Sequence, residues 1–154
     1  MSGEEAPDFT LPSGPDRAFH LADHRGRPVV LAFYPADWSP VCSDQLSLYQ
    51  AILHEFDAYD ATLAAVSVDG VWCHQAFAQT RGLTFPLLSD FEPKGRVARM
   101  YDAYRSEDGF SERALFVIGP EGRIAWREVV APEVNPGADG ILRVLDEMTA
   151  HLAS

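Results

Sequence analysis

One continuous apolar run, from Val29 to Tyr34, restricts the fold of this chain more than any other segment. Its β-branched and aromatic residues, with no polar alternation, are typical of a strand that is buried on both faces of a sheet. Pro35 ends the run, and apolar residues at helical spacing then follow from Cys42 to about Ala58. The sequence therefore predicts a central strand that leads into a helix with a cysteine at its start.

Along the rest of the chain, strand and helix patterns follow the order β-β-β-α-β-α-β-α-β-β-α. Asp69 is expected to cap the helix that Gly82 ends, and residues 119–122 form a turn that closes a late hairpin. This order predicts an α/β, thioredoxin-like fold: a central mixed sheet flanked by helices, with extra N-terminal strands. The expected strands are Asp8–Leu11, Ala18–His20, Pro28–Tyr34, Thr62–Val68, Phe85–Leu88, Ala114–Ile118 and Ile124–Val130, and the two last helices are Gly95–Tyr101 and Gly140–Leu152.

Composition narrows the class of protein. With 154 residues, of which 47% are hydrophobic, the chain predicts a single domain that spans residues 1–154. A net charge of −11 argues against nucleic acid or an anionic membrane as the main partner. No apolar run approaches the roughly 20 residues of a membrane-spanning helix, and the acidic N-terminus does not resemble a signal peptide. We therefore expect a cytoplasmic protein.

A cysteine at a helix N-terminus is suited to chemistry, because free N–H groups and the helix dipole favour the reactive thiolate. The chain has two cysteines, Cys42 and Cys73. A structural disulfide is rare in the cytoplasm, so the two are either reduced thiols or a working redox couple.

The segment from Pro35 to Cys42 resembles the peroxiredoxin motif Pro-x-x-x-Thr/Ser-x-x-Cys, with Ser39 as its hydroxyl residue. Residues 6–11 resemble the opening segment of that family, and Arg113 precedes a strand similar to the one that carries its arginine. Residues 69–72 look closest to the alkyl-hydroperoxide reductase E-like group. This resemblance, to the AhpC/TSA thiol peroxidase family, implies reduction of hydrogen peroxide and organic hydroperoxides, no cofactor or metal, and a homodimer.

The expected chemistry is consistent with these residue types. Cys42 supplies the attacking sulfur and becomes a sulfenic acid, Ser39 donates a hydrogen bond, and Arg113 stabilises developing negative charge. Pro35 shields the pocket from water. Two departures from the family pattern stand out: the hydroxyl residue is serine rather than threonine, and Gln45 occupies a position that is often acidic, which predicts modest turnover.

Cys73 has two interpretations. It either condenses with the sulfenic acid of Cys42 to form an intramolecular disulfide, which a thioredoxin- or glutaredoxin-like reductant recycles, or it is a small core residue beside Ala76 and Phe77. Its neighbour His74 is either a base for Cys73 or a surface histidine, and we expect the latter. A zinc site is not expected, because Cys42, Cys73 and His74 lack both the ligand spacing and a fourth ligand.

Three alternatives to this two-cysteine peroxidase remain open. The first is a one-cysteine peroxidase that is recycled by an external thiol. The second is a thioredoxin-like dithiol–disulfide oxidoreductase, against which stand Ser39 in place of the first cysteine and the absence of a proline before Ala114. The third is a non-catalytic binding module, which would not need Ser39, Cys42 and Arg113 together.

Overall fold

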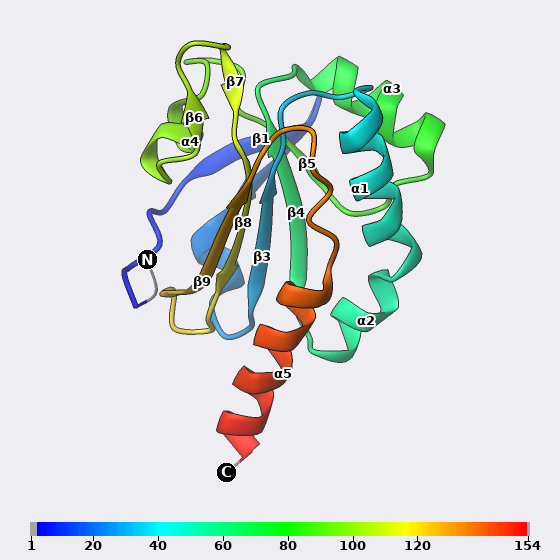
Figure 1. The fold of residues 1–154 in the computed structure, drawn as a ribbon. Coiled ribbons are helices and arrows are strands. Elements are labelled where there is room, and N and C mark those ends of the chain that lie inside the picture. The colour runs from blue at the N-terminus through cyan, green and yellow to red at the C-terminus, as the bar shows by residue number, and fades with distance from the viewer. Residues whose placement is uncertain (1–2, 154) are drawn as a thin grey trace.

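A five-stranded mixed sheet forms the centre of the computed structural model, which describes the backbone of residues 3–153 and the side chains of residues 3–149 (Figure 1). Its strand order is β5-β4-β3-β8-β9. Strands β3 (Val29–Phe33), β4 (Thr62–Ser67) and β5 (Leu87–Ser89) are parallel, whereas β8 (Arg113–Ile118) runs antiparallel to β3, and β9 (Ile124–Val130) antiparallel to β8. Every residue of β3 and β8 is buried. The predicted central mixed sheet is confirmed.

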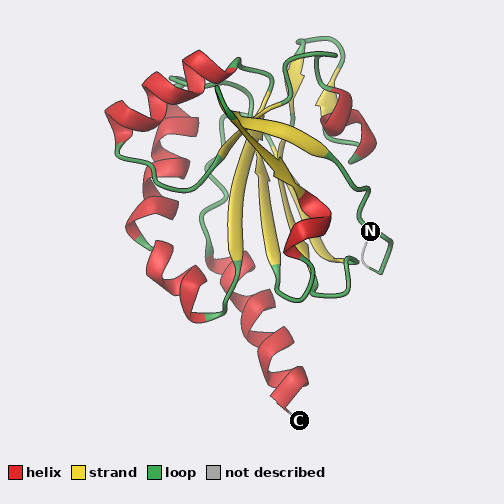
Figure 2. Cartoon of the chain, turned by 180° about the vertical axis from the view of Figure 1, so that it is seen from behind, coloured by secondary structure: helices red, strands yellow, loops and turns green. Residues whose placement is uncertain are grey.

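Both faces of the sheet are covered. One face packs against the helices α1 (Pro40–Ala51), α2 (Leu53–Ala58), α3 (Val71–Arg81) and α5 (Asp139–Ala153). The other is covered by the hairpin of β1 (Thr10–Gly14) and β2 (Arg17–His20), the 3-10 helix η1 (Leu21–His24) and α4 (Arg96–Met100), as the view from behind shows (Figure 2). This is the helix-flanked arrangement, with extra N-terminal strands, that the order of elements predicted.

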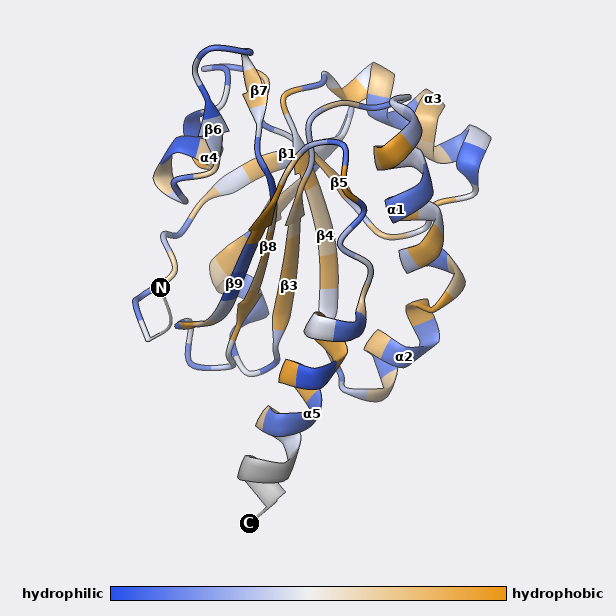
Figure 3. Ribbon diagram, viewed as in Figure 1, coloured by the Kyte–Doolittle hydropathy of each residue, from blue (hydrophilic) through white to orange (hydrophobic). Residues whose placement is uncertain are grey.

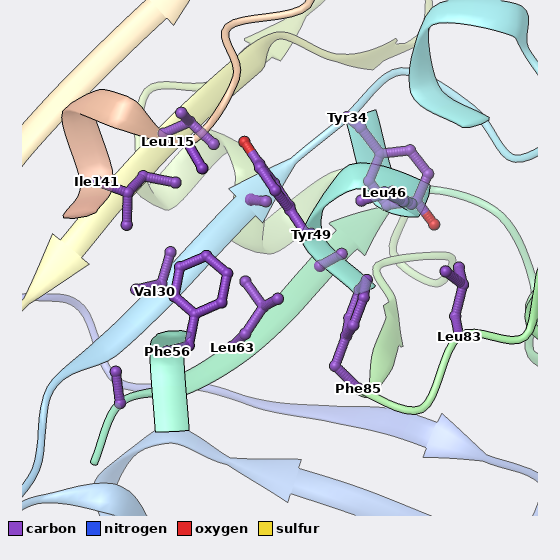
Figure 4. Close-up of a cluster of buried hydrophobic side chains, with 14 of the residues drawn as sticks. Val30, Tyr34, Leu46, Tyr49, Phe56, Leu63, Leu83, Phe85, Leu115 and Ile141 are labelled. Atoms are coloured by element: carbon purple, nitrogen blue, oxygen red, sulfur yellow. The ribbon is translucent and has the colours of Figure 1, made fainter. Parts of the chain in front are cut away.

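Hydropathy explains this layering. The central strand β3 is apolar along its length, whereas the edge strand β9 includes Arg127 and Glu128, and α1, α2 and α5 carry mixed faces (Figure 3). Alternate strand residues therefore point into two separate cores. On the helix-covered face, strand residues meet Tyr49 and Phe56 from α1 and α2 and Ile141 from α5 (Figure 4). Cys42 belongs to this same core.

Two details differ from the sequence-based expectation. The helix expected from Cys42 to Ala58 is interrupted at Ile52, which has a non-helical φ of −111°, although no glycine or proline signals the break. A second hairpin, β6 (Tyr104–Arg105) with β7 (Phe110–Ser111), was not predicted. Within the described residues, no helix is long and apolar enough to cross a membrane.

Candidate active site

The sheet topology brings three candidate residues to one edge. Because β3 and β4 are parallel neighbours, the helices that follow them, α1 and α3, begin at the same edge (Figure 1). The antiparallel strand β8 starts at that edge, since Ala114 pairs with Phe33. Cys42 near the start of α1, Cys73 near the start of α3 and Arg113 at the start of β8 therefore lie at the same end of the sheet, although they are far apart in sequence.

Cys42 is the third residue of α1 and its side chain is fully buried. Pro40 occupies the first turn of the helix, where its missing N–H costs nothing. The remaining N–H groups of a first helical turn lack partners within the helix and stabilise a nearby anion. The sulfur thus lies in a favourable electrostatic position, but a reagent reaches it only when the covering segment moves locally.

Ser39 is the N-cap residue of α1, yet its hydroxyl does not form the usual capping hydrogen bond. Among the described residues, its buried Oγ has no hydrogen-bond partner at all. Pro35, at the other end of the same loop, is buried. A buried hydroxyl without a partner is unusual, and this one remains free to donate to a bound molecule.

Arg113 is almost completely buried, with 2% of its surface exposed. Its Nη1 donates to Gln45 Oε1 over 2.7 Å, its Nε donates to the carbonyl oxygen of Pro132 over 2.9 Å, and its Nη2 donates to the same carbonyl. Gln45 lies one turn after Cys42 in α1. The acceptors are an amide and a carbonyl, so these bonds orient the guanidinium without neutralising its charge.

The amide of Gln45 is itself held in place. Its Nε2 donates to the hydroxyl of Tyr49 over 3.0 Å, and that hydroxyl donates to the carbonyl of Gly137 over 2.8 Å. Burial raises the pKa of Tyr49 far above its usual value, so the hydroxyl keeps its proton. Sequence reasoning noted only the missing charge at Gln45 and missed its bond to Arg113. It also missed the loop before α5, which supplies Pro132 and Gly137.

A second polar cluster lies beside the loop that leads from β3 to Cys42. The carboxylate of Asp37 accepts a hydrogen bond from Tyr34 Oη over 2.5 Å and contacts His74 Nδ1 at 2.7 Å, while His74 Nε2 contacts the carbonyl of Leu88 at 3.0 Å. His74 is only 4% exposed, so the expectation of a surface histidine is wrong. It packs inward because α3 turns this side chain toward Asp37 and β5.

Asp69 does not cap α3, contrary to expectation; Gly70 is the N-cap residue. Instead, Asp69 Oδ2 accepts hydrogen bonds from the Asp37 N–H over 2.8 Å and from Ser67 Oγ over 2.6 Å. The carboxylate therefore ties the loop that precedes α1 to the end of β4.

Cys73 is half-buried among these polar groups rather than within the hydrophobic core. Its sulfur and carboxylate oxygens of Asp37 and Asp69 all lie within 4.8 Å of one another. Burial raises the pKa of the Cys73 thiol to about 11; the negative charges of Asp37 and Asp69 act in the same direction, and the nearby indole N–H of Trp38 opposes them. Cys73 is therefore a protonated thiol at neutral pH.

The known proteins that this chain resembles belong to one family. Residues 2–127 match the model of the AhpC/TSA family. Alkyl hydroperoxide reductase E of Mycobacterium tuberculosis is 35% identical over 131 residues, which cover 84% of this chain and 86% of the relative. Peroxiredoxin-1 of Gallus gallus is 31% identical and covers 93% and 76% of the two chains.

Solved structures agree with these sequence matches. The crystal structure of Enterococcus faecalis AhpC superposes with a TM-score of 0.89 at 26% identity, covering 99% of this chain and 95% of that one. The reduced 2-Cys peroxiredoxin of Plasmodium vivax gives a TM-score of 0.90, also at 26% identity, and covers 99% and 83%.

Proposed function

The chain belongs to the AhpC/TSA family of peroxiredoxins, and we propose that it reduces hydrogen peroxide and organic hydroperoxides through the thiolate of Cys42. The family and its thiol peroxidase activity are those expected from the motif that ends at Cys42. The single observation that carries the proposal is the surroundings of this cysteine. A helix N-terminus, a free Ser39 hydroxyl and an arginine whose charge is not neutralised by its hydrogen-bond acceptors all lie at one sheet edge.

In the proposed reaction, the Cys42 thiolate attacks one peroxide oxygen and the O–O bond breaks. The sulfur becomes a sulfenic acid, and the other oxygen leaves as hydroxide or alkoxide, which takes a proton from solvent. Ser39 donates a hydrogen bond to the reacting oxygen. Arg113 stabilises the negative charge that develops on the leaving oxygen, an interaction that strengthens as the bond breaks.

Peroxide consumption by the purified protein, measured with a dithiol reductant, tests this function directly. A peroxidase consumes hydrogen peroxide and an organic hydroperoxide in a Cys42-dependent manner. A dithiol–disulfide oxidoreductase would instead reduce protein disulfides without consuming peroxide, and a binding module would do neither. Either of the last two results would overturn the proposal.

Cys73 is the proposed resolving residue. Its thiol attacks the sulfenic acid of Cys42, so that a disulfide forms and water leaves. The proposal is supported by the contact of Cys73 with Trp38, which belongs to the loop that leads to Cys42, and by the packing of the Trp38 ring on Phe77 of α3 at a centroid distance of 5.1 Å. A disulfide needs Cα atoms within about 7 Å, so the start of α1 or α3 unwinds during this step.

We predict that Cys73→Ser protein reacts with one equivalent of peroxide and then stalls or overoxidises, because no internal thiol traps the sulfenic acid. Wild-type protein should lose both free thiols and still migrate as a monomer on non-reducing gels. Mass spectrometry distinguishes the disulfide from the sulfinic acid. Equal multi-turnover rates for Cys73→Ser and wild type would instead favour the one-cysteine peroxidase.

A thioredoxin- or glutaredoxin-like protein is the proposed reductant, since the oxidised enzyme presents a disulfide to it. A reducing compartment such as the cytoplasm is the setting in which both cysteines would be free before each turnover.

We also propose a homodimer. Three exposed aromatic side chains surround the first half of α3: Trp72 is 70% exposed, Phe91 58% and Trp38 47%. Large exposed apolar groups in one region are typical of interfaces. Light scattering should give twice the chain mass of 17.0 kDa, and Trp72→Ser should shift the equilibrium toward monomer. A monomer at micromolar concentration would contradict this proposal.

A further inference from the structure

We propose that Asp69 slows the attack of Cys73 on oxidised Cys42, so that the sulfenic acid persists long enough for an external thiol to compete with Cys73. The charge of Asp69 would thus favour an external thiol over Cys73 in this step. This inference rests on the resolving role proposed above for Cys73, and it concerns the rate of that step only.

Charged and titratable groups from several elements face the Cys73 sulfur. Asp37 approaches from the loop after β3 and Asp69 from the end of β4, each with a carboxylate oxygen within 4.8 Å. His74 is the next residue on α3 and contacts Asp37, as does Tyr34 from the end of β3. Burial raises the pKa of Tyr34 well above its usual value, so this phenol is neutral.

Asp37 belongs to a buried hydrogen-bonded cluster. Its carboxylate accepts a hydrogen bond from the Tyr34 hydroxyl at 2.5 Å and contacts His74 Nδ1 at 2.7 Å, while His74 Nε2 contacts the carbonyl of Leu88 at 3.0 Å. Replacing Asp37 would therefore disrupt this cluster as well as remove a charge beside Cys73.

Asp69 has simpler surroundings. The donors to its carboxylate are the hydroxyl of Ser67 and the backbone N–H of Asp37, and both are neutral. These bonds hold the carboxylate in place beside Cys73. Asp69 therefore opposes ionisation of the Cys73 thiol together with burial and Asp37, and it is the carboxylate that can be neutralised without breaking the contacts of Asp37 with Tyr34 and His74.

The size of the effect follows from the chemistry of thiols. Burial, Asp37 and Asp69, in this order, raise the pKa of the Cys73 thiol from 9.0 to about 11, which means roughly 100-fold less thiolate at neutral pH; Asp69 accounts for one part of this shift. A more basic thiolate is also a better nucleophile, which recovers a factor of roughly ten. Cys73 should thus resolve the sulfenic acid about tenfold more slowly than an unperturbed thiol would. During that delay, an external thiol that reaches the buried Cys42 when the covering segment moves would form a mixed disulfide with it and release water.

The first test measures Cys73 directly, in Cys42→Ser protein, where it is the only thiol. Asp69→Asn keeps an oxygen that accepts both hydrogen bonds but removes the charge. We expect iodoacetamide to modify Cys73 at least about threefold faster at pH 7 in the Asp69→Asn variant, with the midpoint of the pH profile shifted downward. Asp57→Asn, which removes an exposed carboxylate of α2, is the matched control and should match the parent. An unshifted profile in Asp69→Asn would overturn the inference.

The second test measures the step itself, with both cysteines present. Protein is mixed with one equivalent of hydrogen peroxide, quenched at intervals with a thiol-blocking reagent and analysed by mass spectrometry. The Cys42–Cys73 disulfide should form at least about threefold faster in Asp69→Asn than in wild type or Asp57→Asn. Equal disulfide rates would overturn this inference while leaving the resolving role intact. No disulfide in wild type or in Asp69→Asn would overturn the resolving role of Cys73, and this inference with it.

Discussion

Cys42→Ser protein should consume peroxide no faster than the dithiol reductant does alone, while remaining folded. Serine retains the shape of the cysteine but replaces the sulfur nucleophile with a hydroxyl that is not ionised at neutral pH and is a poor nucleophile toward peroxides. The side chain is fully buried in the helix-covered core, so the new hydroxyl should cost about 1–2 kcal/mol of unfolding free energy. Thermal unfolding followed by circular dichroism checks the fold, and a coupled assay measures peroxide consumption.

The matched control for this experiment is Cys73→Ser, which removes the other thiol but leaves Cys42 in place. It should still reduce one equivalent of peroxide in a single turnover, whereas Cys42→Ser should reduce none. If a folded Cys42→Ser protein retained a substantial fraction of the wild-type rate, the mechanism proposed for Cys42 would be wrong.

Arg113→Ala should slow the oxidation of Cys42 by about 100-fold or more, the effect typical of removing a preorganised donor from a developing anion. The guanidinium is buried, fixed by Gln45 and Pro132, and paired with neutral acceptors. Its charge is thus available to the reacting oxygen atoms. Stopped-flow fluorescence of the tryptophans, with a pseudo-first-order excess of peroxide, measures the rate.

Two further variants separate the loss of the Arg113 charge from a loss of protein stability. Arg113→Ala leaves buried acceptors on Gln45 and Pro132 without donors, which should cost about 1–3 kcal/mol each, so its thermal stability is measured alongside. Arg113→Lys keeps the charge but loses the fork that contacts both acceptors, and we expect it to recover part of the rate. Arg143→Ala, which changes an exposed arginine of α5, is the control. A folded Arg113→Ala protein with the wild-type rate would place Arg113 outside the reaction.

Gln45 lacks the charge that is often found at its position, yet it still contacts Arg113. From the sequence, a neutral residue at an often acidic position predicted modest turnover. The structure shows the amide accepting from Arg113 at 2.7 Å and anchored in turn by Tyr49. The orienting role is retained without a charge. Modest turnover therefore stays a prediction, and the uncompensated charge of Arg113 argues against it.

The sequence alone determined the features that depend on local pattern. The apolar run from Val29 predicted a buried central strand, and the spacing of Pro35, Ser39 and Cys42 placed a thiol at a helix start. These predictions succeeded because a strand's burial and a helix's beginning depend on residues within a few positions of one another. The alternation of strands and helices likewise sufficed for the mixed sheet, because few topologies satisfy it.

Tertiary structure decided everything that depends on contacts between distant elements. Arg113 and Gln45 are 68 positions apart, and His74 and Asp37 are 37 apart. Whether such side chains meet depends on strand register and on the rotation of each helix against the sheet, which periodicity does not specify. For that reason the sequence placed His74 on the surface and assigned Asp69 to a helix cap. The packed fold instead buries His74 against Asp37 and positions the charge of Asp69 beside Cys73.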